Sequence, residues 1–139
     1  MKKIKVVLDT NVLYAGLYSA TGASHQIFRA IERGTIKIVI STALLFEYEY
    51  ILQRNRTELG LSGRDIEKVL DNLCRLSKHQ KIYFLWRPYL TDPGDDHILE
   101  VAVASGTKTI VTHNVKDFKG TDKFGVRAIT PRKLLEEIK

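Results

Sequence analysis

The sequence has little of what marks secreted, membrane-spanning or fibrous proteins. Its single cysteine, Cys74, cannot form an internal disulfide, which excludes a disulfide-stapled scaffold and a cysteine-rich zinc module. Three prolines and nine glycines in 139 residues exclude collagen-like and low-complexity classes. No apolar run approaches the ~18 residues of a membrane span, and Asp9 ends the N-terminal apolar run well short of a signal-peptide core. We therefore expect a cytoplasmic protein without a membrane segment.

Positive charge is what the sequence has in excess. The 22 Lys and Arg residues outnumber the 16 Asp and Glu residues, which gives a net charge of +6. A basic excess favours contact with nucleic acid or with an acidic partner protein, although a merely soluble basic protein can have the same balance. The chain is long enough to bury a core, and we expect one domain over residues 1–139.

Short β-branched runs alternate with longer segments of helical period. Strands are predicted at residues 4–8, 36–40, 82–85, 109–112 and 126–129. Helices are predicted to begin at Ser24, Ser41 or Thr42, Ser62 and Thr130, and two of them to end at Gly34 and Gly106. This alternation predicts an α/β fold with a mainly parallel sheet of four or five strands flanked by helices. Such sheets bind ligands outside the carboxyl ends of their strands.

Two carboxylates fall where such a sheet would bind a ligand. Asp9 ends the first predicted strand, where it is either a ligand or the cap of the following helix. Glu47 shares a helix face with Leu44, three residues before it, and Ile51, four residues after it. A lone carboxylate on this apolar stripe is costly unless it is paired or metal-bound. Glu47 therefore either meets a basic residue such as Arg54 or ligates a cation.

Further acids gather before a predicted helix and after a predicted strand. Asp92, Asp95 and Asp96 lie before or inside the first turn of one helix, where capping accounts for one of them. A cation would offset the mutual repulsion of the three. Asn114 and Asp117 follow the strand near residue 112, in a turn composition that is also common without function.

Oxygen ligands of this kind suit Mg²⁺ or Mn²⁺, whereas zinc sites favour histidine and cysteine. An acidic metal pocket in a basic protein points to phosphodiester hydrolysis, because the metal neutralises phosphate charge and helps to deprotonate the attacking water.

Four segments in order resemble the PIN domain, the fold of many metal-dependent ribonucleases. They are LDTNVL at residues 8–13, STALLFEY at 41–48, DPGDDHILEVA at 92–102 and IVTHNVKDF at 110–118. The resemblance covers nearly the whole chain and is closest to the VapC-type toxin components of prokaryotic toxin–antitoxin pairs. It implies a PIN-like three-layer sandwich and a Mg²⁺- or Mn²⁺-dependent endoribonuclease that acts on RNA. It also implies a small antitoxin encoded nearby as partner, and a homodimer.

Residue by residue, the resemblance implies that Asp9, Glu47 and Asp96 are catalytic metal ligands. Asp95 is the alternative to Asp96, which we prefer because its interval to Thr112 fits the spacing of the family.

At the fourth acidic position of the family this chain has Asn114, a departure that puts a second metal in doubt. An amide can ligate a metal or orient a water, but it brings no charge, and Asp117 can supply the missing carboxylate from one turn later. Three residues match polar positions that support the acids by hydrogen bonds in the family, namely Thr10, Asn11 and Thr112.

Three further features each allow two interpretations. Lys116, Lys119 and Lys123 either grip RNA phosphates or form a solvated face. The aromatic residues between 83 and 89, around Arg87, either stack bases or belong to the core or a dimer contact. The four histidines lack metal-ligand spacing, and His113 either touches substrate or is a surface residue. Two alternative functions also remain, a PIN-like module that binds RNA without cutting it and a housekeeping RNA-processing nuclease.

Overall fold

The computed structural model of the chain describes residues 4–82, 90 and 95–138. Its centre is a five-stranded parallel sheet in the order β3-β2-β1-β4-β5. The strands are β1 (Ile4–Leu8), β2 (Ile36–Ile40), β3 (Lys78–His79), β4 (Thr109–Val111) and β5 (Arg127–Ile129). The predicted α/β fold with a parallel sheet of four or five strands is confirmed.

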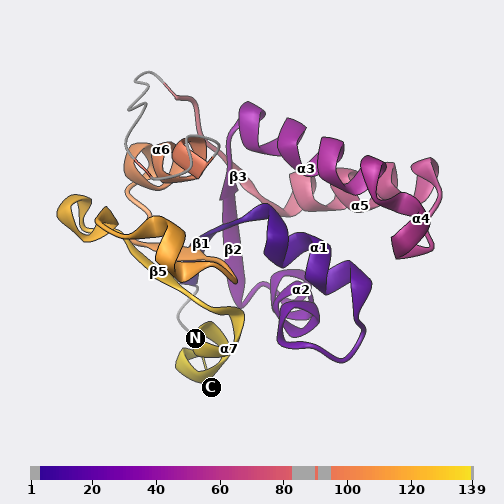
Figure 1. Ribbon diagram of the computed structural model, residues 1–139, viewed down its shortest axis with the longest axis horizontal. Coiled ribbons are helices and arrows are strands. Elements are labelled where there is room, and N and C mark those ends of the chain that lie inside the picture. Colours follow the sequence, from indigo (N-terminus) through magenta and orange to yellow (C-terminus); the bar gives the residue numbers. More distant parts are fainter. Residues whose placement is uncertain (1–3, 83–89, 91–94, 139) are drawn as a thin grey trace.

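Helices cover both faces of the sheet. They are α1 (Thr10–Tyr18), α2 (Ala23–Arg33), α3 (Thr42–Arg54), α4 (Arg56–Leu59), α5 (Gly63–Leu76), α6 (Asp96–Ser105) and α7 (Pro131–Glu137), with the 3₁₀ helices η2 (Val115–Phe118) and η3 (Thr121–Phe124). Figure 1 shows α6 on one side of the sheet and α1, α2, α3 and α5 on the other, which makes the three layers of the predicted sandwich. Among the described residues, no helix combines the length and the apolar character needed to cross a membrane.

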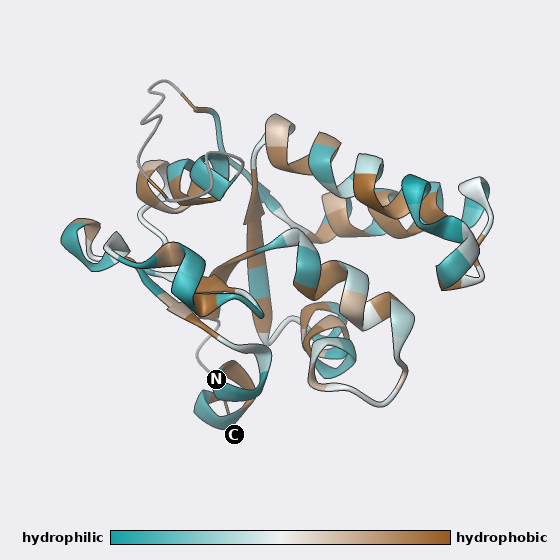
Figure 2. Ribbon diagram, viewed as in Figure 1, coloured by the Kyte–Doolittle hydropathy of each residue, from teal (hydrophilic) through white to brown (hydrophobic). Residues whose placement is uncertain are grey.

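The central strand explains where the site forms. β1 lies between β2 and β4, and Val6, Val7 and Leu8 are buried on it. A strand that helices cover on both faces is mostly apolar, and Figure 2 shows brown stretches on the central strands, interrupted by teal. Leu8 pairs in register with Val111, so the residues that follow β1 and β4 emerge together at the carboxyl edge of the sheet.

Most helix ends follow local capping rules. Ser41 Oγ accepts a hydrogen bond from Leu44 N at 3.1 Å, and Ser62 forms a capping box with Asp65. Thr130 caps α7, which begins with Pro131. The predicted ends at Gly34 and Gly106 are confirmed, because both glycines adopt left-handed backbone angles with φ of 83° and 70°.

One predicted detail is wrong, and one strand was not predicted. α2 begins at Ala23 with Gly22 in the extended cap conformation, so Ser24 lies inside the first turn and its Oγ is 2.9 Å from His113 Nε2. The strand that was not predicted is β3, where the chain pairs with β2 directly after α5 and Gln80 N donates to Ile40 O at 2.8 Å. Of the short strand or edge segment predicted over residues 82–85, Ile82 lies outside any strand and residues 83–85 lie outside the described part of the chain.

Candidate functional site

Asp9 is held at the carboxyl end of β1. Its side chain is almost buried, and Thr112 Oγ1 donates to Asp9 Oδ2 at 2.7 Å. Although Asp9 occupies the N-cap position of α1, its side chain makes no capping hydrogen bond. Burial raises the pKa of Asp9, and the nearby charge of Glu47 adds to this rise, against hydrogen bonds from Thr112 and the Thr10 backbone and the charge of His97. The Asp9 carboxylate is therefore held between Thr112, which follows β4, and the backbone at the start of α1.

A hydrogen-bond network around Thr112 orients Asp9. Thr112 Oγ1 gives its proton to Asp9 and accepts from Asn114 N at 3.0 Å and from Asn11 Nδ2 at 3.4 Å. Asn11 Oδ1 in turn accepts from His113 N at 3.2 Å. The segment after β4 is thus tied to the start of α1, and the lone pairs of the Thr112 hydroxyl are used so that its proton points at Asp9.

Glu47 projects from α3 into the same region. The Thr10 hydroxyl donates to Glu47 Oε2, and His97 Nε2 lies 2.8 Å from Glu47 Oε1. Burial opposes ionisation of Glu47, but the hydrogen bonds from His97 and Thr10 and the charge of His97 outweigh it and hold its pKa below the ordinary value. Within the described residues, the ion-pair partner of Glu47 is His97, whereas Arg54 lies over the Tyr50 ring at 6.0 Å.

Tyr48 joins the two acid-bearing segments. Its buried hydroxyl donates to Leu8 O at 2.6 Å, which links the residue after Glu47 to the residue before Asp9. Burial and the negative charges of Asp9 and Glu47 raise the pKa of Tyr48 well above its ordinary value, so this donor keeps its proton. The two carboxylates are close enough to influence each other, and Tyr48 fixes their spacing.

The remaining predicted acids flank this pair. Asp96 is fully buried at the start of α6, and its Oδ1 accepts from Leu90 N at 2.8 Å. Asp95 occupies the N-cap position of α6 without a side-chain cap bond, and Asp92 lies outside the described residues. Asn114 is exposed directly after the Thr112 network, and Asp117 is half-buried in η2.

Asp9 and Glu47 offer carboxylate oxygens, the ligands that a hard divalent cation prefers. Burial is the main cause of the raised pKa of Asp9, and the negative charge of Glu47 adds to it, so a cation at this sheet edge would stabilise both carboxylates. Across residues 4–82, 90 and 95–138, however, no three Asp, Glu, His or Cys side chains are arranged to hold a metal. Asp96 remains the candidate for a third oxygen ligand, because it directly precedes His97 in the sequence and His97 contacts Glu47.

Sequence reasoning missed two buried polar residues of α6. His97 bridges to Glu47, and its buried Nδ1 has no hydrogen-bond partner in the described part of the chain. Glu100, one turn after Asp96, is 2% exposed. The feature that could have revealed these two residues is the burial of the whole helix. Residues 96–102 are all buried, and an α-helix buried on every face must also bury its polar side chains.

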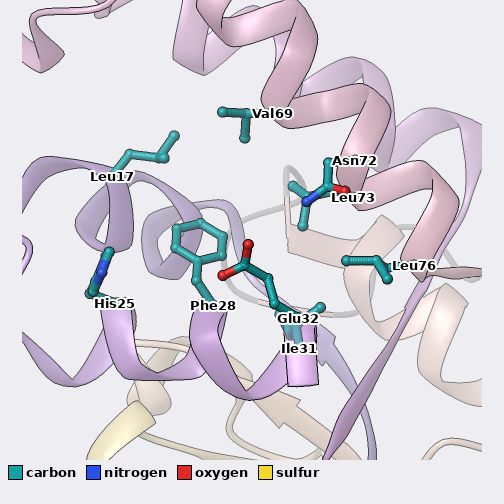
Figure 3. Close-up of a pocket in the computed structure, with 9 residues that line it drawn as sticks. All are labelled: Leu17, His25, Phe28, Ile31, Glu32, Val69, Asn72, Leu73 and Leu76. Atoms are coloured by element: carbon teal, nitrogen blue, oxygen red, sulfur yellow. The ribbon is translucent and has the colours of Figure 1, made fainter. Parts of the chain in front are cut away.

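A cavity lies between α1, α2 and α5, away from these acids (Figure 3). It has a volume of about 190 Å³ and is mainly apolar, with Leu17, Phe28 and Leu73 among its lining residues. Neither Asp9 nor Glu47 lines it, so the chemistry of the acids and this cavity are separate.

Comparisons with known proteins agree on the fold. The family model described as PIN domain matches residues 5–116. VapBC2 from Rickettsia felis, in a structure bound to a DNA fragment from their promoter, is similar with a TM-score of 0.64 and 16% identity, over 91% of this chain and 98% of that one. PAE2754 from Pyrobaculum aerophilum is similar with a TM-score of 0.60 and 19% identity, over 97% of this chain and 89% of that one. A comparison with curated protein sequences gave no match.

At these identities the two structures show a shared fold only. The family match shows the family, because it covers most of the sequence and all four motifs except the end of the fourth. The chain belongs to the PIN-domain family.

Proposed function

We propose that the protein is a Mg²⁺- or Mn²⁺-dependent endoribonuclease. PIN domains are typically nucleases and usually metal-dependent. The observation that supports this proposal most directly is the pairing of Asp9 and Glu47 at the carboxyl edge of the sheet in a protein of net charge +6. The positive charge favours an RNA polyanion, and the two carboxylates provide a site for a divalent cation.

Asp9, Glu47 and Asp96 would hold the cation, with Asp95 the alternative to Asp96 and with Asn114 and Asp117 at the rim. A divalent ion held by these residues would neutralise charge on the scissile phosphate and would supply a bound water of lowered pKa as the nucleophile. The chain prepares this site in two ways. Thr112 orients Asp9, and hydrogen bonds from His97 and Thr10 keep Glu47 ionised. Lys116, Lys119 and Lys123 attract the flanking phosphates.

The test compares two glutamates of α3 on an end-labelled RNA of mixed sequence. Glu47→Gln removes a proposed ligand, whereas Glu49→Gln makes the same change at an exposed position of the same helix. We expect wild type and Glu49→Gln to cut in Mn²⁺ or Mg²⁺, and Glu47→Gln to lose at least 100-fold in rate, about 2.7 kcal/mol.

The products decide the chemistry. Attack by a water leaves 5′-phosphate and 3′-hydroxyl ends, whereas attack by the RNA 2′-hydroxyl leaves a 2′,3′-cyclic phosphate. Cyclic-phosphate ends, or undiminished cutting in EDTA, would contradict the metal mechanism and return Asp9 and Glu47 to structural roles.

A biological role as the toxin of a toxin–antitoxin pair is part of the proposal, supported by the likeness to VapBC2. It places the protein in the cytoplasm with a small antitoxin as partner and a homodimer as its assembly. Induced expression should then arrest growth, the Asp9→Asn variant should not, and a neighbouring small acidic protein should relieve the arrest. Growth at the normal rate with active nuclease would instead indicate a housekeeping RNA-processing enzyme.

One observation favours a second candidate, a PIN-like module that binds RNA without cutting it. Asn114 stands where many family members have an acid, and its side chain is exposed. RNA binding by the wild type with no cleavage in Mn²⁺ or Mg²⁺ would establish this alternative.

A further inference from the structure

A groove between α1 and α3 begins at Glu47. The two helices run alongside each other (Figure 1), and the groove has a volume of about 380 Å³, within the ~300–1,000 Å³ of typical ligand pockets. Its lining residues are Thr10, Asn11, Tyr14, Glu47, Ile51 and Asn55. Glu47 and Ile51 of α3 and Asn55, the C-cap that follows this helix, recur at every fourth position and so form a line along one side of the helix.

Tyr14 lines this groove, and Tyr18, one turn further along α1, lies outside the lining residues but against Tyr14, so that the two rings form an aromatic step. The ring of Tyr14 stacks on that of Tyr18, with centroids 5.9 Å apart and planes inclined by 20°. The Tyr14 hydroxyl donates to Glu58 Oε2 at 2.8 Å, which fixes the orientation of the ring. Tyr18 is 64% exposed, so most of a large aromatic surface faces solvent next to the groove.

Charge at the far end of the groove suits a phosphate. The exposed residues Arg54 and Arg56 flank Asn55, which lines the groove at that end. Glu58 lies nearby, but its carboxylate is engaged by Tyr14. Glu47 at one end, the Tyr14 ring along the wall and, at the other end, Asn55 between two arginines in the sequence follow the order of groups in a nucleotide chain, in which phosphates alternate with bases. The Arg54 guanidinium lies 6.0 Å from the centroid of the Tyr50 ring, and Tyr50 does not line the groove.

We propose that this groove binds the nucleotide next to the scissile phosphate of a single-stranded RNA, with its base stacked on the Tyr14–Tyr18 step and its next phosphate near Arg54 and Arg56. The position of the scissile phosphate rests on the proposed function. Single-stranded nucleic acid commonly binds through aromatic stacking combined with a positive groove. A protein segment fits less well, because Ile51 is the one aliphatic residue in the lining.

The experiment measures binding in EDTA, so that it does not depend on cleavage. Fluorescence anisotropy follows a labelled 12-nucleotide single-stranded RNA and an otherwise identical oligonucleotide with abasic nucleotides. Tyr18→Ala should weaken binding of the intact RNA about tenfold, equivalent to about 1.4 kcal/mol, as expected for one lost base stack. It should leave binding of the abasic oligonucleotide unchanged, and Tyr18→Phe should bind like the wild type.

The matched control is Phe46→Ala. Phe46 is 62% exposed, close to the exposure of Tyr18, but within the described part of the chain its ring does not contact a ring that lines the groove, whereas that of Tyr18 contacts Tyr14. Its replacement should leave RNA affinity within about twofold. Thermal unfolding of each variant confirms that the fold is intact.

Each outcome bears on the proposal. A wild type that does not bind RNA, equal losses for Tyr18→Ala and Phe46→Ala, or equal losses on intact and abasic oligonucleotides would overturn it. Unchanged RNA binding by Tyr18→Ala would also overturn it. If the predicted binding pattern holds while no divalent cation supports cleavage, the nucleotide site stands and the proposed catalytic function fails.

Discussion

Asp9 carries a cost at the scale of a single residue. Its folded pKa lies above the ordinary value of 3.8, chiefly because the carboxylate is buried. The native state therefore holds its proton to higher pH than the unfolded state does. The stability that this protonation contributes is fully present below about pH 3.8 and is lost as the pH rises through the folded pKa.

Replacing Asp9 by Asn should remove this pH dependence. Asn retains an acceptor for the Thr112 hydroxyl but never ionises, so without divalent cations Asp9→Asn should be more stable than wild type at pH 7. The difference should shrink toward zero as the pH falls to 3, and each unit of raised pKa accounts for about 1.4 kcal/mol. Urea unfolding in EDTA measures it, with the exposed Asp71→Asn as control. A variant less stable than wild type at pH 7 would contradict the prediction.

The sequence singled out individual candidate residues where the local pattern around one position was sufficient. Glu47 stood out because it lies on an apolar stripe, and Asp9 because it ends a strand. His97 did not stand out, because its partner Glu47 lies 50 residues away and the contact exists only once α3 and α6 are placed around the sheet. Asp96 was singled out from the sequence, but its complete burial was not predicted, since that burial depends on the packing of α6.

At the scale of elements, α1 and α2 pack closely together at Gly16, which has no side chain. A Cβ at Gly16 would lie 2.5 Å from Phe28 Cε2 and 3.0 Å from Ser24 O. In an open helix, Gly→Ala stabilises by about 1 kcal/mol. Here the overlap should dominate, so Gly16→Ala should destabilise the protein by about 1–3 kcal/mol in urea unfolding.

A second substitution separates crowding from other causes. Phe28→Leu removes the ring that the new methyl group would strike, so adding Gly16→Ala to Phe28→Leu should cost less than adding it to wild type. Equal costs in the two backgrounds would show that Phe28 is not the obstacle.

The elements themselves were largely readable from the sequence. β1, β2, β4 and β5 follow β-branched runs, and the caps at Ser41, Ser62 and Thr130 depend on neighbours within three residues. β3 was not predicted, because its two exposed residues become a strand only by pairing with β2. The start of α2 was misplaced because Ser24 bonds to His113, 89 residues away, instead of capping its own helix.

At the scale of the whole molecule, the net charge of +6 should make RNA binding depend on salt. Replacing Lys116, Lys119 and Lys123 by Gln should make the plot of log affinity against log salt less steep by up to about 2, at about 0.7 for each lost contact with single-stranded RNA. The slope is measured from RNA affinities determined by fluorescence anisotropy at salt concentrations from about 50 to about 300 mM, which bracket the physiological value.

The control for the lysine variant alters total charge equally elsewhere. Lys68, Lys108 and Lys133 are exposed on α5, before β4 and on α7. Their joint replacement by Gln should leave the slope nearly unchanged. Similar changes for both triple variants would indicate that overall charge, and not the segment after β4, governs RNA attraction.

The bond from Thr112 to Asp9 joins residues 103 positions apart, and this separation has a consequence during synthesis. At ~5–20 residues per second, a ribosome makes Asp9 roughly 5–20 s before it makes Thr112. The nascent chain thus carries Asp9 through about 100 residues of synthesis, and Tyr48 through about 60, before β4 begins at Thr109 beside β1. The carboxylate pair can therefore reach its final geometry only after the ribosome has made β4.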